Sequence, residues 1–120
     1  MLVRRLTVGD AAAYRALRLR AFHDHPEAFT SSYEEEARKP LSYSEQRLGV
    51  TSPAWYWGAF VPDPHSAVGL LVGSVGLERE QRLKNRHNAV VIGLYVTPEE
   101  ARRGVGRPLL DMLLAAARRT

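Results

Sequence analysis

The stretch Val90–Leu110, VVIGLYVTPEEARRGVGRPLL, contains the clearest structural pattern in this chain. Its near-continuous apolar run, Val90–Val96, predicts a strand that is covered on both faces. Gly93 interrupts the run, and a glycine inside a strand often marks a bulge or a place where a ligand comes close. The strand is expected to end at Thr97-Pro98, because proline has no N–H group to donate to a neighbouring strand.

A short turn and an arginine-rich loop follow the strand and open an amphipathic helix, in which leucines recur at helical spacing. The first turn of a helix has N–H groups without intrahelical partners, and the helix dipole adds partial positive charge there. Gly104 and Gly106 have no Cβ, so a phosphate group could approach the backbone closely. Pro108 falls in the first turn, where its missing N–H costs least. The loop therefore predicts a diphosphate-binding site.

This pattern resembles the acetyl-CoA-binding core of the GNAT superfamily of N-acetyltransferases. The signature of that family is Arg/Gln-x-x-Gly-x-Gly/Ala after a strand that ends in Val-x-Pro. Gly104 and Gly106 match the two small positions, and Val96-Thr97-Pro98 matches the strand exit. The first signature position falls on Ala101, so one side chain is missing from the phosphate site, and the neighbouring arginines are candidates to compensate for it.

The resemblance implies an enzyme that transfers the acetyl group of acetyl-CoA, its co-substrate, to a primary amine of a small molecule or peptide. In the family, the pantetheine arm pairs like a strand with the central strand, a backbone N–H stabilises the oxyanion, and the pyrophosphate lies on the glycine loop. Carried over to this sequence, the implied cofactor site consists of Leu94, Tyr95, Val96, Arg102, Arg103, Gly104, Val105, Gly106 and Arg107.

Two N-terminal helices and their connection form one wall of the acceptor pocket in relatives with a comparable Pro-Glu-Ala-Phe stretch, here residues 26–29. By this resemblance Phe29, Tyr33 and Glu34 are candidates for substrate binding. The acidic run that contains Glu34 has a second interpretation, a solvated helix face, which we favour. We assign no general base or acid, because the predicted central strand contains no carboxylate. Tyr95 is a conceivable proton donor.

Length and composition fit one domain covering residues 1–120, and the resemblance implies that its fold class is α+β. Alternating or apolar runs predict strands, and apolar residues at a spacing of four predict helices. The resemblance implies a mixed, mostly antiparallel sheet flanked by helices in an α/β/α sandwich, in the order β-α-α-β-β-β-α. The predicted strands and helices before the central strand are Leu2–Thr7, Ala13–Phe22, Ser42–Leu48, Ala54–Val61 and Ala67–Leu77.

By the same resemblance, the chain corresponds to the N-terminal two-thirds of the fold and stops at Thr120, at the end of the cofactor helix. The strand forming the other lip of the acetyl-CoA slot, and the tyrosine acid that follows it, would then be absent. The central strand would have an unpaired edge. We therefore expect a fragment of a longer protein, or a homo-oligomer that completes the sheet. The alternative function is a catalytically incomplete coenzyme A-binding or oligomerising module.

The net charge of +4 and a pI near 9.8 point to an anionic partner, which coenzyme A would satisfy as well as nucleic acid would. The basic segment Arg79–Arg86 lacks interleaved aromatic residues, so we favour a solvated loop over a nucleic-acid-binding tip.

With no cysteine, the chain has no disulfide or thiolate metal site. His23 and His25 are two residues apart and would not share a helix face, so we assign no metal. We also see no membrane-spanning run or signal peptide, and expect a cytoplasmic protein.

Overall fold

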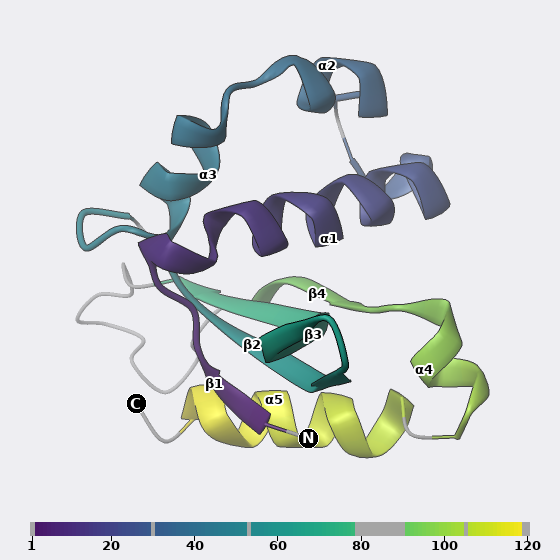
Figure 1. Ribbon diagram of the computed structural model, residues 1–120. Helices are drawn as coiled ribbons and strands as arrows, with labels where there is room; N and C mark the ends of the chain where they lie inside the picture. The colour runs from purple at the N-terminus through teal and green to yellow at the C-terminus, as the bar shows by residue number, and fades with distance from the viewer. Residues whose placement is uncertain (1, 30, 53, 79–90, 105, 119–120) are drawn as a thin grey trace, which may run out of the picture.

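Four antiparallel strands form a sheet in the order β1-β2-β3-β4, and helices cover both of its faces (Figure 1). The computed structural model describes residues 2–29, 31–52, 54–78, 91–104 and 106–118. The strands are β1 (Leu2–Arg5), β2 (Ala54–Asp63), β3 (Ser66–Glu78) and β4 (Val91–Val96). The helices are η1 (Val8–Asp10), α1 (Ala11–Asp24), η2 (Pro26–Ala28), α2 (Tyr33–Arg38), α3 (Leu41–Leu48), α4 (Pro98–Arg102) and α5 (Gly106–Arg118).

Helices α1 and α3 pack on one face of the sheet and α5 packs on the other (Figure 1). This confirms the predicted fold class, an α+β fold with an antiparallel sheet flanked by helices. The predicted strands and helices outside the central stretch are also present, with most ends shifted by one or two residues. The basic segment Arg79–Arg86 lies outside the described residues. None of the described helices is long and apolar enough to cross a lipid bilayer.

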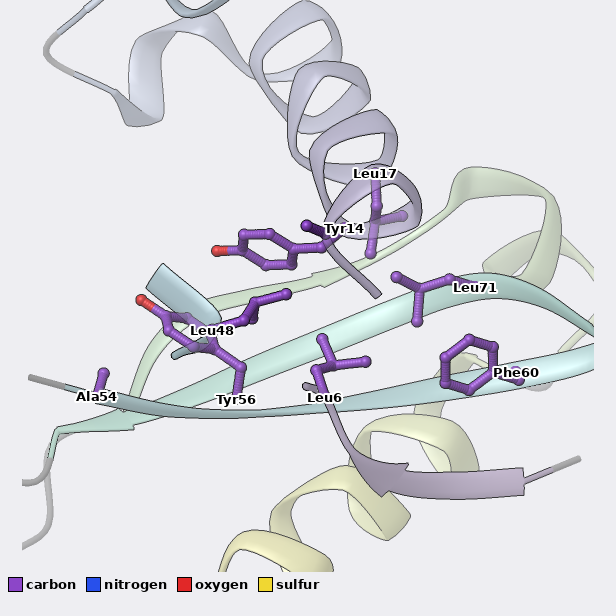
Figure 2. Packing of buried hydrophobic residues seen from close by; sticks show 9 residues of the cluster. Leu6, Tyr14, Leu17, Leu48, Ala54, Tyr56, Phe60 and Leu71 are labelled. Carbon is purple, nitrogen blue, oxygen red and sulfur yellow. The ribbon is translucent and has the colours of Figure 1, made fainter. Parts of the chain in front are cut away.

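Between α1, α3 and the sheet lies a cluster of buried side chains, which includes aromatic as well as aliphatic residues (Figure 2). Tyr14 and Leu17 come from one face of α1, since they are three positions apart on the helix. Figure 2 shows them above Tyr56 and Leu71 of the two central strands. The rings of Tyr14 and Tyr56 are tilted against each other, with centroids 5.4 Å apart. This packing fixes α1 over the middle of the sheet.

The opposite face of the sheet carries a second cluster, which α5 covers. Trp57 and Val75 of the central strands meet Leu113 of α5, and the Leu113 side chain is fully buried. Trp55 lies on the same face of β2 and packs against this cluster. Trp55 and Trp57 therefore share the side of β2 that faces this cluster.

Strand β4 contains a bulge at the glycine that interrupts its apolar run. Ser74 of β3 pairs with Tyr95, and Gly76 pairs with Ile92, so Gly93 and Leu94 together face the single residue Val75. The bulge predicted from Gly93 is confirmed. Strand β3 also bulges, because the residues that pair with Ala59 and Phe60 of β2 are Gly73 and Leu71.

The structure corrects two predictions for the central stretch. Leu94 is 43% exposed, so the prediction that β4 is covered on both faces is wrong at this position. The physical reason is that β4 is the last strand of the described sheet, where a neighbour on its outer side would be needed for cover. The turn predicted after Thr97 is instead the short helix α4, which Pro98 opens as its first residue.

Candidate active site

A cavity of about 690 Å³ lies beside β4, and its volume falls in the range typical of small-molecule sites. Its walls come from α1 and η2, from the two strands β3 and β4, and from α4 and α5. The lining residues are Tyr14, Leu17, Arg18, Ala21, His25, Ala28, Phe29, Ser74, Leu94, Tyr95, Val96, Ala101, Arg107 and Leu110. The cavity therefore joins segments that are far apart in the sequence.

The strand wall of the cavity is the bulged part of β4. Tyr95 packs toward the α1 side of the sheet, whereas Val96 packs toward the α5 side. Leu94, inside the bulge, is partly exposed and lines the cavity. Because a bulge leaves one residue out of the regular ladder, this is where backbone groups of β4 are available to another molecule.

The loop between α4 and α5 lies next to the cavity, because Ala101 of α4 and Arg107 of α5 line it on either side of this loop. Gly104 follows the last turn of α4 in the left-handed backbone region, with φ of 80°, which favours glycine. A Cβ added there would have no atom within 4 Å, so the space above this glycine is open. Arg107, in the first turn of α5, lines the cavity with a side chain that is 85% exposed. Arg102 and Arg103 are exposed on the same loop.

Polar contacts hold the C-terminal turn of α1 against β4 and α4. The Tyr95 hydroxyl donates to Asp24 Oδ2 at 2.9 Å, and Arg20 of α1 forms an ion pair with Glu99 of α4. Burial and the hydrogen bond to the Asp24 carboxylate together raise the pKa of Tyr95 to about 12. These contacts fix the distance between the helix wall and the strand wall of the cavity.

Helix α2 supports the α1 wall through a buried carboxylate. Glu36 is 5% exposed and accepts from Arg18 Nε at 2.9 Å and from Lys39 Nζ at 3.0 Å. Burial acts to raise the pKa of Glu36, but these two cations outweigh it and lower the pKa overall. The Arg18 guanidinium also lies 5.9 Å from the ring centre of Phe29, which stacks on Phe22 with centroids 3.8 Å apart.

The structure brings five of the residues predicted for the site to the cavity wall: Phe29, Leu94, Tyr95, Val96 and Arg107. Gly104 lies in the adjoining loop together with Arg102 and Arg103, and Gly106 is the first residue of α5. Val105 lies outside the described residues. The functional roles of all these residues stay predictions.

Tyr33 and Glu34 are exposed on α2 and do not belong to the described lining of the cavity. Of the acidic run, Glu36 points inward and Glu35 caps its own helix by accepting from the Ser32 N–H. Sequence reasoning missed His25 as a cavity residue. The available signal was its position between the end of a helix and a proline, where the chain turns.

No group of three or more His, Asp or Glu side chains suited to holding a metal ion gathers among the residues that the structure describes.

Comparison with known proteins agrees with the fold and the motif. Residues 16–120 match the family model described as the acetyltransferase (GNAT) family. A ribosomal-protein-alanine N-acetyltransferase from Brucella melitensis biovar Abortus 2308 is 23% identical, with a TM-score of 0.61 over 99% of this chain and 73% of that one. A probable acetyltransferase from Staphylococcus epidermidis ATCC 12228 is 20% identical, with a TM-score of 0.63 over 98% of this chain and 66% of its own.

The PaiA N-acetyltransferase from Thermoplasma acidophilum, solved in complex with coenzyme A, is 19% identical. Its TM-score is 0.58, and the match covers 91% of this chain and 66% of that one. The chain thus spans about two-thirds to three-quarters of the length of these structures. No curated protein sequence matches it.

The fold and the family match together define an acyltransferase of the N-acetyltransferase class. The chain belongs to the acetyltransferase (GNAT) family.

Proposed function

We propose that this chain binds acetyl-CoA in the cavity beside β4 and transfers the acetyl group to a primary amine. One observation carries the proposal: a single cavity is lined both by the bulged edge strand β4 and by Ala101 and Arg107, the residues on either side of the glycine loop before α5. An extended molecule with amide groups at one end and phosphates at the other requires both features, a strand edge for the amides and a glycine loop for the phosphates.

The loop suits the pyrophosphate and the β4 edge suits the pantetheine arm. Gly104 leaves open space above the loop, and Arg102, Arg103 and Arg107 supply positive charge near the start of the 13-residue helix α5. The pantetheine amides would pair with backbone groups of Leu94 and Val96, as an added strand pairs with a sheet edge.

In this proposal, the reacting carbonyl lies at the bulge of β4. A thioester carbonyl that reaches Leu94 or Tyr95 would meet backbone that the bulge has taken out of the regular ladder. A backbone N–H there would stabilise the oxyanion that develops when an amine attacks. The acceptor would then approach from the α1 side, where Tyr14, Leu17 and Phe29 give the cavity an aromatic and apolar wall. Tyr33 and Glu34, on the neighbouring helix α2, stay predicted acceptor contacts.

A second candidate function is a coenzyme A-binding or oligomerising module without catalysis. The observation that favours it is the state of Tyr95, the conceivable proton donor. Its hydroxyl hydrogen is already donated to Asp24, and its pKa is raised to about 12, so it gives up its proton reluctantly. In this alternative, a second copy of the chain would add to the edge of β4.

Isothermal titration with acetyl-CoA tests the proposal, with Gly104→Glu as the disrupting variant. A glutamate there brings negative charge to the phosphate site and strains a backbone with φ of 80°, so we expect at least about tenfold weaker binding. Gly104→Ala is the matched control, because it carries the same backbone strain without the charge. It should bind closer to the wild type than Gly104→Glu does. Equal binding by all three proteins would contradict the proposed phosphate site.

Release of free thiol from acetyl-CoA in the presence of primary amines then separates the two functions. Suitable amines are phenylethylamine, spermidine and a short peptide with a free N-terminal alanine. Binding together with amine-dependent thiol release supports the transferase. Binding without release from any of these amines, with a dimer mass in solution, supports the module.

A further inference from the structure

We infer that His25 is the general base that removes the proton from the incoming ammonium group, an inference that rests on the proposed acetyl transfer. Amines are mostly protonated at neutral pH, so a primary amine must lose a proton before its nitrogen can attack a thioester. Among the described residues that line the cavity, His25 is the one whose side-chain type changes charge near neutral pH.

The backbone fixes His25 at the junction of the helix wall and the strand wall. It is the C-terminal cap of α1, where its N–H donates to the Ala21 carbonyl at 2.9 Å, and Pro26 turns the chain directly after it. Figure 1 shows this end of α1 lying over the path from β4 to α4. Its imidazole ring lies edge-on to Tyr95, with centroids 6.0 Å apart, and Tyr95 directly follows the bulge residue Leu94. His25 thus stands on the acceptor side of the strand that would hold the thioester.

The surroundings of the imidazole suit a group that takes up a proton and passes it on. Glu27 Oε2 lies 3.8 Å from His25 Nδ1, which is longer than a hydrogen bond. The side chain of His25 is 54% exposed, so the accepted proton can leave to water.

Other charged groups near His25 are already engaged. Asp24 accepts from Tyr95, and Arg18 of α1 is paired with the buried Glu36. Arg107 of α5 lines the cavity 3.5 Å from Asp111. Tyr95 of β4 keeps its proton at neutral pH, because its pKa is about 12. None of these four described groups is positioned to accept the ammonium proton in place of His25 at neutral pH.

The bonds and protons of the acetyl transfer balance when His25 is the only base. The ammonium N–H bond breaks and its proton goes to the imidazole, which frees the nitrogen lone pair to form the N–C bond with the acetyl carbon. As the tetrahedral intermediate collapses, the C–S bond breaks and the electron pair leaves with sulfur. The second proton of the nitrogen then goes to the thiolate, so the products are the acetamide and free coenzyme A. His25 returns its proton to water.

His25→Gln removes the base while keeping a polar side chain and the helix cap, which the backbone makes. His23→Gln is the matched control, since His23 is 75% exposed, lies two residues away and is not part of the described cavity lining. We expect His25→Gln to lower kcat by about 100-fold or more with the most reactive of the three amines named above. The rise of kcat/KM with pH that the base produces should disappear, and added imidazole should restore part of the rate. His23→Gln should keep the wild-type profile.

Histidine NMR signals provide a readout that does not depend on turnover. The His25 imidazole signals, assigned by their loss in His25→Gln, should shift when acetyl-CoA saturates the protein, whereas those of His23 should not. Acetyl-CoA binding without a His25 shift would overturn the inference while leaving the proposed function intact. A kcat for His25→Gln within threefold of wild type, with an unchanged pH profile, would overturn it equally. Absence of acetyl-CoA binding in the calorimeter would instead overturn the proposed function.

Discussion

The two faces of the sheet are built by different means. On the α5 face, the buried cluster consists of apolar or aromatic side chains such as Trp57, Val75 and Leu113. On the α1 face, buried and half-buried charges stand among the apolar residues, with Glu36 between two cations and Arg47 against the tyrosine hydroxyls of the core. Apolar packing is non-directional and stabilises the fold, whereas hydrogen-bonded polar groups fix particular distances. The cavity lies chiefly against the α1 face, which uses hydrogen-bonded polar groups.

Arg47 of α3 illustrates how the α1 face is fixed. Its Nε donates to the Tyr14 hydroxyl at 3.2 Å and its Nη2 to the Tyr56 hydroxyl at 2.7 Å. Burial raises the pKa of Tyr56 to about 12, although the Arg47 charge acts to lower it. The guanidinium therefore ties α3 to both α1 and β2. Because Tyr14 also lines the cavity, this network holds one wall of the site at a defined place.

The largest stability effect should come from breaking the α5 face. Leu113→Ala removes a fully buried side chain and leaves a cavity, so we expect it to lower the free energy of unfolding by about 3 kcal/mol. Denaturant unfolding measures this loss. Met112→Ala, at a neighbouring side chain that is 41% exposed, should cost far less. Equal losses would show that α5 does not pack as described.

The next effect tests the charged contact on the α1 face. Glu36→Gln leaves Arg18 and Lys39 without a buried anion and should cost about 2 kcal/mol at pH 7. Since the folded state lowers the pKa of Glu36, its contribution is present above the pKa of the unfolded chain, about 4.3, and is lost as pH falls through the folded pKa. The free energies of unfolding of wild type and variant should therefore converge as the pH falls below the pKa of the unfolded chain. Glu34→Gln, at an exposed position, should change little at either pH. A difference that persists undiminished into acid would contradict this account.

The smallest of the three effects should come from Tyr95→Phe, which removes one hydrogen bond between β4 and α1. The folded state raises the pKa of Tyr95 to about 12, so its contribution to stability is complete below the unfolded pKa of about 10 and is lost as pH rises through the folded value. Tyr95→Phe should thus have a lower melting temperature than wild type at pH 8, and this difference should disappear above pH 10. Tyr33→Phe, at a 40% exposed tyrosine, is the control. A deficit that grows with pH would refute the assigned hydrogen bond.

Features that depend on a residue's own backbone could be predicted from the sequence. Pro98 ends a strand because it lacks an N–H, and Gly93 marks the bulge. The start of α5 at Gly106, with Pro108 in its first turn, follows from the same local rules. These positions outline the strand, the loop and the helix of the candidate cofactor site, so these three elements could be predicted from local sequence alone.

Features that depend on distant neighbours could not be predicted in this way. The exposure of Leu94 follows from the place of β4 at the edge of the described sheet, which no local pattern encodes. Likewise, which glutamate of the acidic run turns inward is decided by Arg18, 18 positions earlier in the chain. His25 is a candidate general base only because the end of α1 lies against Tyr95 of β4.

The contacts across the cavity have a consequence for how the protein folds. Asp24 and Tyr95 are 71 positions apart, and Arg20 and Glu99 are 79 apart, so the two walls meet only after a large loop of chain has closed. Closing such a loop costs entropy before the contacts form, which places them late in folding. A molecule bound between the walls would therefore add its binding energy to the fully folded state alone. It would raise the melting temperature by an amount that grows with its free concentration relative to its Kd.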